Sequence, residues 1–397
     1  MRPHQIKLTD SEGVQTCAEL ARKAGRFCID TEFMSEGHYR ALLCLTQVAV
    51  ADPTAPSGLH TILIDGLDSS VETGPLASLL ADPEIEVVLH AGRQDAAILR
   101  RAWNTELRNI FDTQTAAGFV GEGAQSGYAN LLRSVLGLRV NKTASYTRWD
   151  ARPLTEEQLL YAEEDVAHLL ALADELKRRL TEQGRLEWAL EECRRLEQAS
   201  DAQDPLTAWE RLPRANQLEP QTRAVARRLA AWREQTAAVL DRPVGQVLQD
   251  QPLLEMAKRN PLSLDALRQL RGVYPAFVTR HGNQIIEAIR EGLADPPIPR
   301  DPRPNQSDPA DTPLIALAEA LLRARAMQSG LAYELIAKRS ELERIVAAAR
   351  MSAPEPDVRT LSGWRRELAG TDLEALLGGR TALSVGSGGA LELHPLS

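Results

Sequence analysis

The stretch FCIDTE, residues 27–32, joins a short apolar run to two carboxylates. The apolar run predicts a buried β-strand over residues 27–31. Side chains alternate along a strand, so Asp30 and Glu32 should face the same side, about 6.6 Å apart. Two such carboxylates repel each other unless a cation lies between them, and Mg²⁺ or Mn²⁺ prefers oxygen ligands of this kind. An exposed strand end would carry the same pattern, so the stretch alone does not decide for a metal site.

Two further acidic residues follow expected strands. Asp95, in HAGRQD (residues 90–95), comes after a strand that ends at His90 and lies in the first turn of the next expected helix. A carboxylate there is also favoured by the helix dipole, so Asp95 could serve its helix or a metal. Asp112 lies at a second strand-to-helix junction. We favour Asp95 as the ligand and expect Asp112 to cap its own helix.

Tyr161 and Asp165 lie four residues apart on a helix expected from Thr155 to Leu180, with Thr155 and Gln158 as a capping box. This spacing places both side chains on one helix face, about 6 Å apart along the axis. The pair alone is a weak signal. Together with Asp30, Glu32 and Asp95, however, it supplies the four carboxylates that a two-metal phosphodiesterase needs. A tyrosine with a pKa of about 10 stays protonated at pH 7, so it would orient the attacking water.

Strand and helix patterns alternate through the first half of the chain and then change. Besides residues 27–31, strands are expected over 42–50, 61–64 and 87–90, and helices over 93–103, 113–119 and 128–136. This alternation predicts a mixed α/β layer. After about residue 185 only helical patterns remain. A Pro-rich linker is expected at 294–312 and a tail at 381–397, which should be frayed from Ser384 onward. The helices of 313–380 weakly echo those of 205–293, which suggests a diverged duplication.

Composition narrows the class of protein. The 397 residues predict two or three domains, and the four cysteines form no C-x-x-C pair, which favours reduced thiols over disulfides or a zinc site. No apolar run approaches the roughly 20 residues that cross a bilayer, so we expect a cytoplasmic protein with no membrane partner. The net charge is −9, yet residues 205–293 carry 13 basic and 9 acidic side chains. That balance fits a phosphate-contacting module or, equally, a solvated surface.

The ordered motifs resemble the ribonuclease D family, in the tyrosine-bearing branch of the DEDD exonuclease superfamily. The motifs are DTEF (30–33), HAGRQD (90–95), FDTQ (111–114), WDARPL (149–154) and YAEED (161–165). The histidine-bearing branch would have a histidine at the position of Leu160. The resemblance covers roughly residues 5–200 and implies an α/β ribonuclease H-like exonuclease domain over 1–204, with a mixed sheet flanked by helices. The helical remainder resembles two small all-α HRDC (helicase and RNase D C-terminal) domains, at 205–293 and 313–380.

The resemblance also implies a role for each motif residue. Asp30 would contact two metal ions, Glu32 one ion and the substrate end, Asp95 the second ion and Asp165 the first. Tyr161 would position the nucleophilic water. Lys142 would contact phosphate and His90 would also contact the substrate, whereas Arg152 would have a structural role near its turn. The cofactors implied are two Mg²⁺ or Mn²⁺ ions per active site.

Three functions remain open at this stage. The resemblance favours a 3′→5′ exoribonuclease that trims RNA, such as tRNA precursors, and acts as a monomer. A 3′→5′ DNA exonuclease is the first alternative, although the chain has no G-x-x-x-x-G-K-[ST] helicase P-loop. The second alternative is an RNA-binding adaptor with an inactive nuclease domain, although all five motif positions carry the expected residue types.

Overall fold

The computed structural model describes residues 7–140, 148–299 and 308–396. The chain divides into two compact units. One consists of Met1–Glu32, Leu43–Ser200 and Asn305–Ser397, and the other of Phe33–Leu42 and Asp201–Pro304.

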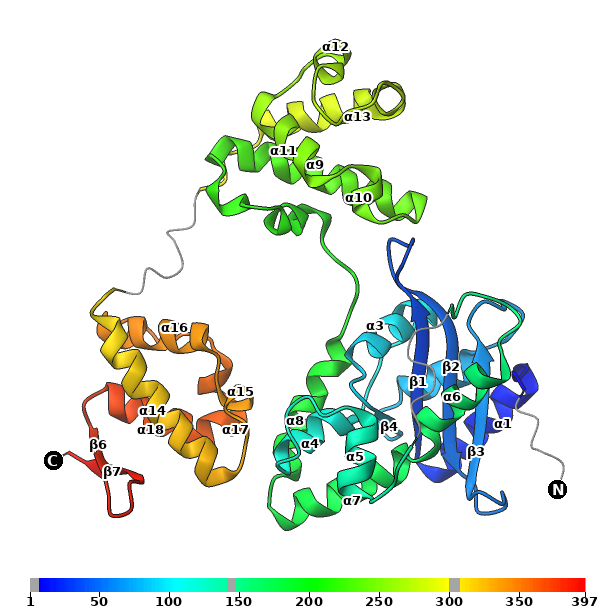
Figure 1. The fold of residues 1–397 in the computed structure, drawn as a ribbon, viewed down its shortest axis with the longest axis vertical. Helices are drawn as coiled ribbons and strands as arrows, with labels where there is room; N and C mark the ends of the chain where they lie inside the picture. The colour runs from blue at the N-terminus through cyan, green and yellow to red at the C-terminus, as the bar shows by residue number, and fades with distance from the viewer. Residues whose placement is uncertain (1–6, 141–147, 300–307, 397) are drawn as a thin grey trace. The chain divides into compact units, whose positions relative to one another are not determined.

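A five-stranded sheet with the order β3-β2-β1-β4-β5 forms the centre of the N-terminal half (Figure 1). Strands β2 and β3 are antiparallel, whereas β4 runs parallel to both β1 and β5, so the sheet is mixed as expected. The strands are β1 (Arg26–Met34), β2 (Leu42–Ala51), β3 (Leu59–Asp65), β4 (Glu86–Leu89) and β5 (Ile110–Asp112). Four strands match the predicted ones. Strand β5 ends at the strand-to-helix junction expected at Asp112, but its range was not predicted because three residues are too few to show an alternating pattern.

Helices flank this sheet and carry several of the predicted motifs. They are α1 (Ser11–Ala24), α2 (Gly74–Leu80), α3 (Arg93–Ala102), α4 (Thr113–Phe119), α5 (Tyr128–Val135), α6 (Glu156–Ala167), α7 (Leu169–Glu182) and α8 (Leu186–Arg194), followed by the 3₁₀ turn η1 (Arg195–Gln198). Helices α1 and α2 are not among the expected ones. The predicted capping box at the start of α6 is present, with Thr155 and Gln158 bonded reciprocally.

The single helix expected from Thr155 to Leu180 is wrong, because the chain breaks it at His168. The His168 backbone leaves the helical region, with φ −119° and ψ 5°. Its N–H donates to the Tyr128 hydroxyl at 3.2 Å. A tertiary hydrogen bond of this kind leaves no mark in the apolar periodicity, and no glycine or proline announces the break.

The first helical group has a hydrophobic core of its own, built around Leu229, Met256 and Ile285. Its elements are η2 (Pro205–Arg211), η3 (Ala215–Gln217), α9 (Pro220–Leu240), α10 (Val244–Val247), α11 (Asp250–Arg259), α12 (Leu264–Arg268) and α13 (Pro275–Ala294). The long helices α9 and α13 pack together, and a Cβ at Gly292 would lie only 2.5 Å from the Val225 backbone. This close approach requires glycine at position 292.

The second helical group shares its core with the α/β part of the chain. Its elements are α14 (Asp311–Ser329), α15 (Tyr333–Ile336), α16 (Arg339–Arg350), η4 (Arg359–Leu361), α17 (Gly363–Arg365), the π-helical turn η5 (Arg366–Gly370) and α18 (Thr371–Leu377). Trp364 is 1% exposed, stacks on Trp188 of α8 at 5.5 Å and meets Phe119 of α4 edge-on at 4.9 Å. One continuous apolar cluster therefore joins this group to α4, α7 and α8.

The tail expected to be frayed instead forms an antiparallel hairpin. Strand β6 (Thr381–Val385) pairs with β7 (Leu391–Pro395), and the turn between them has positive φ at Gly388 and Gly389. The Gly/Ser-rich stretch that suggested disorder is the turn of the hairpin, where glycine accepts the left-handed backbone. Among the helices described, none is apolar over a length that could cross a membrane.

Candidate functional site

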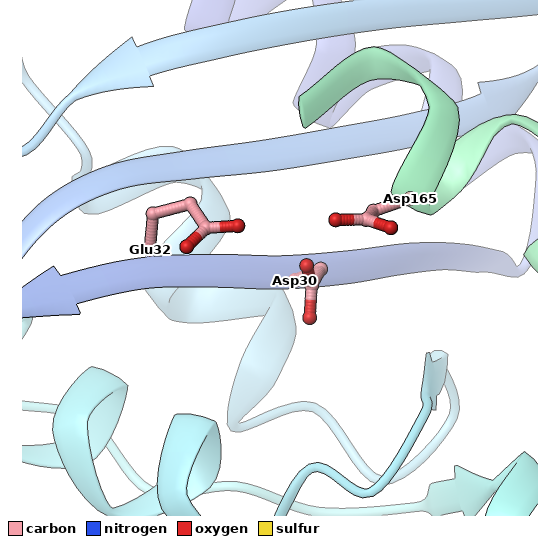
Figure 2. A group of neighbouring side chains, drawn as sticks. All are labelled: Asp30, Glu32 and Asp165. Atoms are coloured by element: carbon pink, nitrogen blue, oxygen red, sulfur yellow. The ribbon is translucent and has the colours of Figure 1, made fainter. Parts of the chain in front are cut away.

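Three carboxylates from two elements converge at strand β1. Asp30 and Glu32 lie on β1 and Asp165 lies on α6, and one oxygen of each is within 4.8 Å of the others. Figure 2 shows Asp165 reaching from its helix toward the two strand residues. Asp30 and Glu32 lie on the same face of the sheet because side chains two residues apart on a strand point to the same side. All three side chains are half-buried, so water screens their mutual repulsion only partly.

The electrostatics of this cluster favour a divalent cation. Burial raises the pKa of Asp30 well above its usual range, and the charges of Asp95, Asp165 and Glu32 raise it further. Burial likewise raises the pKa of Glu32 to about 8, followed by the charges of Asp165 and Asp95. A divalent cation relieves this repulsion by favouring the ionised form of each group. A set of carboxylate oxygens is also the donor type that Mg²⁺ and Mn²⁺ select, so these residues fit such an ion.

Asp95 lies close to the cluster but outside the group of three. It sits in the first turn of α3, is 8% exposed, and accepts a hydrogen bond from the Thr31 hydroxyl. Burial is the main cause that raises the pKa of Asp95 to about 6, and the hydrogen bond from Thr31 opposes it. Thr31 lies between Asp30 and Glu32 on β1, so this contact ties the α3 carboxylate to the same strand.

Asp112, the rival to Asp95, serves two helix N-termini. Its Oδ1 accepts from the Thr115 N–H at 2.7 Å, which caps α4, and its Oδ2 accepts from the Gly92 N–H at 2.8 Å, just before α3. The expectation that Asp112 caps its own helix is therefore confirmed. The second bond fixes the start of the helix that carries Asp95, a contact that the sequence did not suggest.

Tyr161 lies one turn before Asp165 on α6 and is half-buried. Its ring centroid is 6.0 Å from that of Trp149, which is 6% exposed. Burial, followed by the charges of Asp165 and Glu32, raises the pKa of the Tyr161 hydroxyl above its ordinary value. The group therefore keeps its proton at neutral pH.

Arg152 fixes the turn that leads into α6. Its guanidinium donates to the Asp65 carboxylate, at 2.7 Å from Nε, and to the carbonyl oxygens of Cys44 and Trp149, each at 2.8 Å. These bonds join the turn to β2 and β3. The expectation of a structural role for Arg152 is confirmed, and the turn brings Trp149 against Tyr161.

Of the two residues expected to contact substrate, His90 and Lys142, the structure describes only His90. His90 is half-buried and directly follows β4. Its Nδ1 is 2.9 Å from the Thr113 hydroxyl, and its ring lies 5.5 Å from that of Tyr128. Lys142 lies outside the described residues.

One contact at the cluster comes from a residue that sequence reasoning missed. Gln47 of β2 donates from Nε2 to Asp30 Oδ2 at 2.7 Å. The sequence could have indicated that Gln47 has a special role, because an amide side chain within the apolar run LLCLTQVAV (residues 42–50) is unusual in a buried strand. Which acidic residue it meets depends on strand pairing, which the sequence does not give.

Comparison with known proteins places the chain in a family. Residues 5–181 match the family model described as 3′-5′ exonuclease, and residues 222–289 match the HRDC domain. Ribonuclease D of Granulibacter bethesdensis is 37% identical over 389 residues, covering 96% of this chain and 95% of the relative. Ribonuclease D of Gluconacetobacter diazotrophicus is 35% identical over 388 residues, with the same coverage. The chain belongs to the ribonuclease D family.

A solved structure of the same family has the same fold. The crystal structure of Escherichia coli RNase D, described as an exoribonuclease involved in structured RNA processing, matches with a TM-score of 0.80 and 28% identity. The match covers 94% of this chain and 99% of that one. Like other members of the ribonuclease D family, the chain is therefore an enzyme with a 3′→5′ exonuclease domain, a mixed sheet flanked by helices, and an HRDC domain.

Proposed function

We propose that the protein is a metal-dependent 3′→5′ exoribonuclease that releases 5′-nucleotides from RNA 3′ ends, with tRNA precursors as its substrate class. The observation that carries the proposal is the convergence of Asp30, Glu32 and Asp165 in a chain of the ribonuclease D family. The Escherichia coli relative acts in structured RNA processing, which supports RNA as the polymer.

Two Mg²⁺ or Mn²⁺ ions are the proposed cofactors. Asp30 would contact both ions, Glu32 one ion and the terminal end of the substrate, Asp165 the first ion, and Asp95 the second ion. When bound, the ions supply Lewis-acid stabilisation of the phosphate charge and lower the pKa of a water molecule. The hydrogen bond from Thr31 to Asp95 supports this assignment, because it holds Asp95 beside the cluster without adding a positive charge.

The protein's own proton chemistry centres on Tyr161. Its raised pKa keeps the proton on the hydroxyl at pH 7, so Tyr161 orients a water by hydrogen bonding and does not act as a base. The ring of Trp149 lies beside the tyrosine ring, tilted by 44°. His90 and Lys142 would contact the substrate strand.

The C-terminal half would position RNA. We assign residues 205–293 as the first HRDC domain and 313–380 as a second, diverged one, after a linker at 294–312. Each group contains three successive α-helices of similar lengths, which supports the duplication. The lengths are 21, 4 and 10 residues in the first group and 19, 4 and 12 in the second. The four cysteines are free and buried, which supports action in the reducing cytoplasm. We also propose that the protein acts as a monomer.

The test is shortening of an RNA labelled at its 5′ end, in Mg²⁺ or Mn²⁺, beside a DNA of the same sequence. We expect 3′→5′ shortening of RNA that a chelator or Asp30→Asn abolishes. Faster shortening of DNA would make the protein a DNA exonuclease. RNA binding without any shortening would make it an inactive adaptor.

A further inference from the structure

We propose that Gln47 is a positioning residue of the nuclease, holding the Asp30 carboxylate in the orientation that binds metal. The inference rests on the proposed function and adds to it a residue outside the family motifs. Gln47 lies on β2, the neighbour of β1 in the sheet, and is 0% exposed.

The contact restrains one oxygen of Asp30 and leaves the other for ligation. Gln47 Nε2 donates to Asp30 Oδ2 at 2.7 Å, which restrains rotation of the carboxylate. An ionised carboxylate has about four lone-pair positions on its two oxygens, so one donor does not exhaust it. A neutral amide also suits this place better than lysine or arginine would, because it does not compete with a divalent cation for the negative charge.

Gln47 lies in an environment that is unfavourable for a polar side chain. Within the described residues its Oε1 is buried and has no hydrogen-bond partner. A buried acceptor without a partner lowers stability, so an apolar side chain would suit the fold better. Among the described residues, the side-chain hydrogen bond that offsets this cost is the one to Asp30, and that bond serves the acidic cluster.

The adjacent residue, Thr46, provides a matched control. Thr46 is also 0% exposed, and its hydroxyl likewise lacks a partner among the residues described. It pairs with Ile64 of β3, whereas Gln47 pairs with Leu63. Because side chains alternate along a strand, Thr46 points to the opposite face from Gln47. Thr46→Val therefore removes a similar buried polar group away from Asp30.

The experiment compares Gln47→Met, Gln47→Leu and Thr46→Val in the full chain. Mn²⁺ binding to the protein alone is followed by electron paramagnetic resonance, the metal dependence of RNA shortening by gel, and thermal unfolding in chelator by circular dichroism. For both Gln47 variants we expect Mn²⁺ binding roughly 10- to 100-fold weaker, recovery of turnover at high Mn²⁺, and an unfolding midpoint equal to or above that of the wild type. Thr46→Val should leave Mn²⁺ binding unchanged.

The outcomes separate this proposal from the proposed function. Wild-type Mn²⁺ affinity in both Gln47 variants would reject the role of Gln47 while the nuclease assignment stands. An equal loss of affinity in Thr46→Val would also reject it, because burial and not the contact with Asp30 would be responsible. A wild-type protein that neither binds Mn²⁺ nor shortens RNA would reject the proposed function itself. Having two Gln47 variants of different shape keeps the test open if one fails to fold.

Discussion

Two regions of the molecule bury charge in opposite ways. At β1 and α6, Asp30, Glu32 and Asp165 bring like charges within 4.8 Å of one another. At the second helical group, Arg365 is 1% exposed and donates to Glu192 of α8 at 2.5 Å and to the Leu335 carbonyl oxygen at 2.7 Å. The first arrangement opposes folding and the second supports it.

This difference indicates that the carboxylate cluster is a functional site and that the Arg365–Glu192 pair is part of the structural core. Repulsion at the carboxylate cluster has a physical rationale only if a cation relieves it. The Arg365–Glu192 pair is satisfied within the protein and sits beside the stacked Trp364 and Trp188. Changes at the cluster should therefore affect catalysis more than stability, and changes at the pair should do the reverse.

The largest expected effect is on turnover in Asp30→Asn. A metal ion supplies several kcal/mol of transition-state stabilisation, so loss of its ligand should lower turnover roughly 10³-fold. Without metal, the variant should unfold at or above the wild-type temperature, because a neutral amide replaces a carboxyl group whose burial opposes ionisation. RNA shortening and calorimetry in chelator measure the two effects. A large fall in stability together with full turnover would reverse the comparison.

The next effect is on stability in Arg365→Met. Removing one partner of a buried pair typically costs about 3–5 kcal/mol. Turnover per folded molecule should stay near that of the wild type. Arg323→Met is the control, since Arg323 pairs with Glu319 at the surface of the same group and should contribute about 1 kcal/mol or less. Denaturant unfolding measures both, and equal effects would contradict the structural role of the buried pair.

Asp95 and Asp112 lie close together and allow the same comparison between an effect on turnover and an effect on stability. Asp95→Ala should lower turnover about as strongly as Asp30→Asn does. Asp112→Ala should mainly lower stability, by about 1–3 kcal/mol, because the Gly92 and Thr115 N–H groups lose their acceptor. Rates and unfolding midpoints for both variants provide the measurement, and the opposite pattern would exchange the two roles.

The smallest expected effect is a change in the pH slope of stability. Burial raises the pKa of Glu32 from 4.5 to about 8 in the folded protein. A raised carboxyl pKa means that the folded state binds more protons, so in chelator stability should fall as pH rises from 4.5 toward 8. Glu32→Gln should flatten this slope, and saturating Mg²⁺ should reduce it in the wild type. An unchanged slope in Glu32→Gln would show that Glu32 does not contribute to it.

The parts of this site that the sequence predicts are those that depend on spacing between residues close together in the chain. The i, i+2 spacing of Asp30 and Glu32 and the i, i+4 spacing of Tyr161 and Asp165 each define a face, and the capping box marks the start of α6. These features depend on neighbours in the chain. The ordered set of motifs then links them through the family resemblance.

Contacts between distant segments explain what the sequence could not give. The bond from Gln47 to Asp30 depends on β2 lying beside β1, and the break at His168 depends on the Tyr128 hydroxyl. The apolar pattern around Trp364 predicts a helix but not that its core is shared with α4 and α8. Such pairings are fixed by tertiary packing, which periodicity does not encode.

The most direct test of the central claim is anomalous diffraction from crystals of the full chain soaked in Mn²⁺. We expect anomalous density in contact with Asp30, Glu32 and Asp165, and its loss in Asp30→Asn crystals treated in the same way. Mn²⁺ density confined to other parts of the protein, with these three carboxylates bare, would contradict the account.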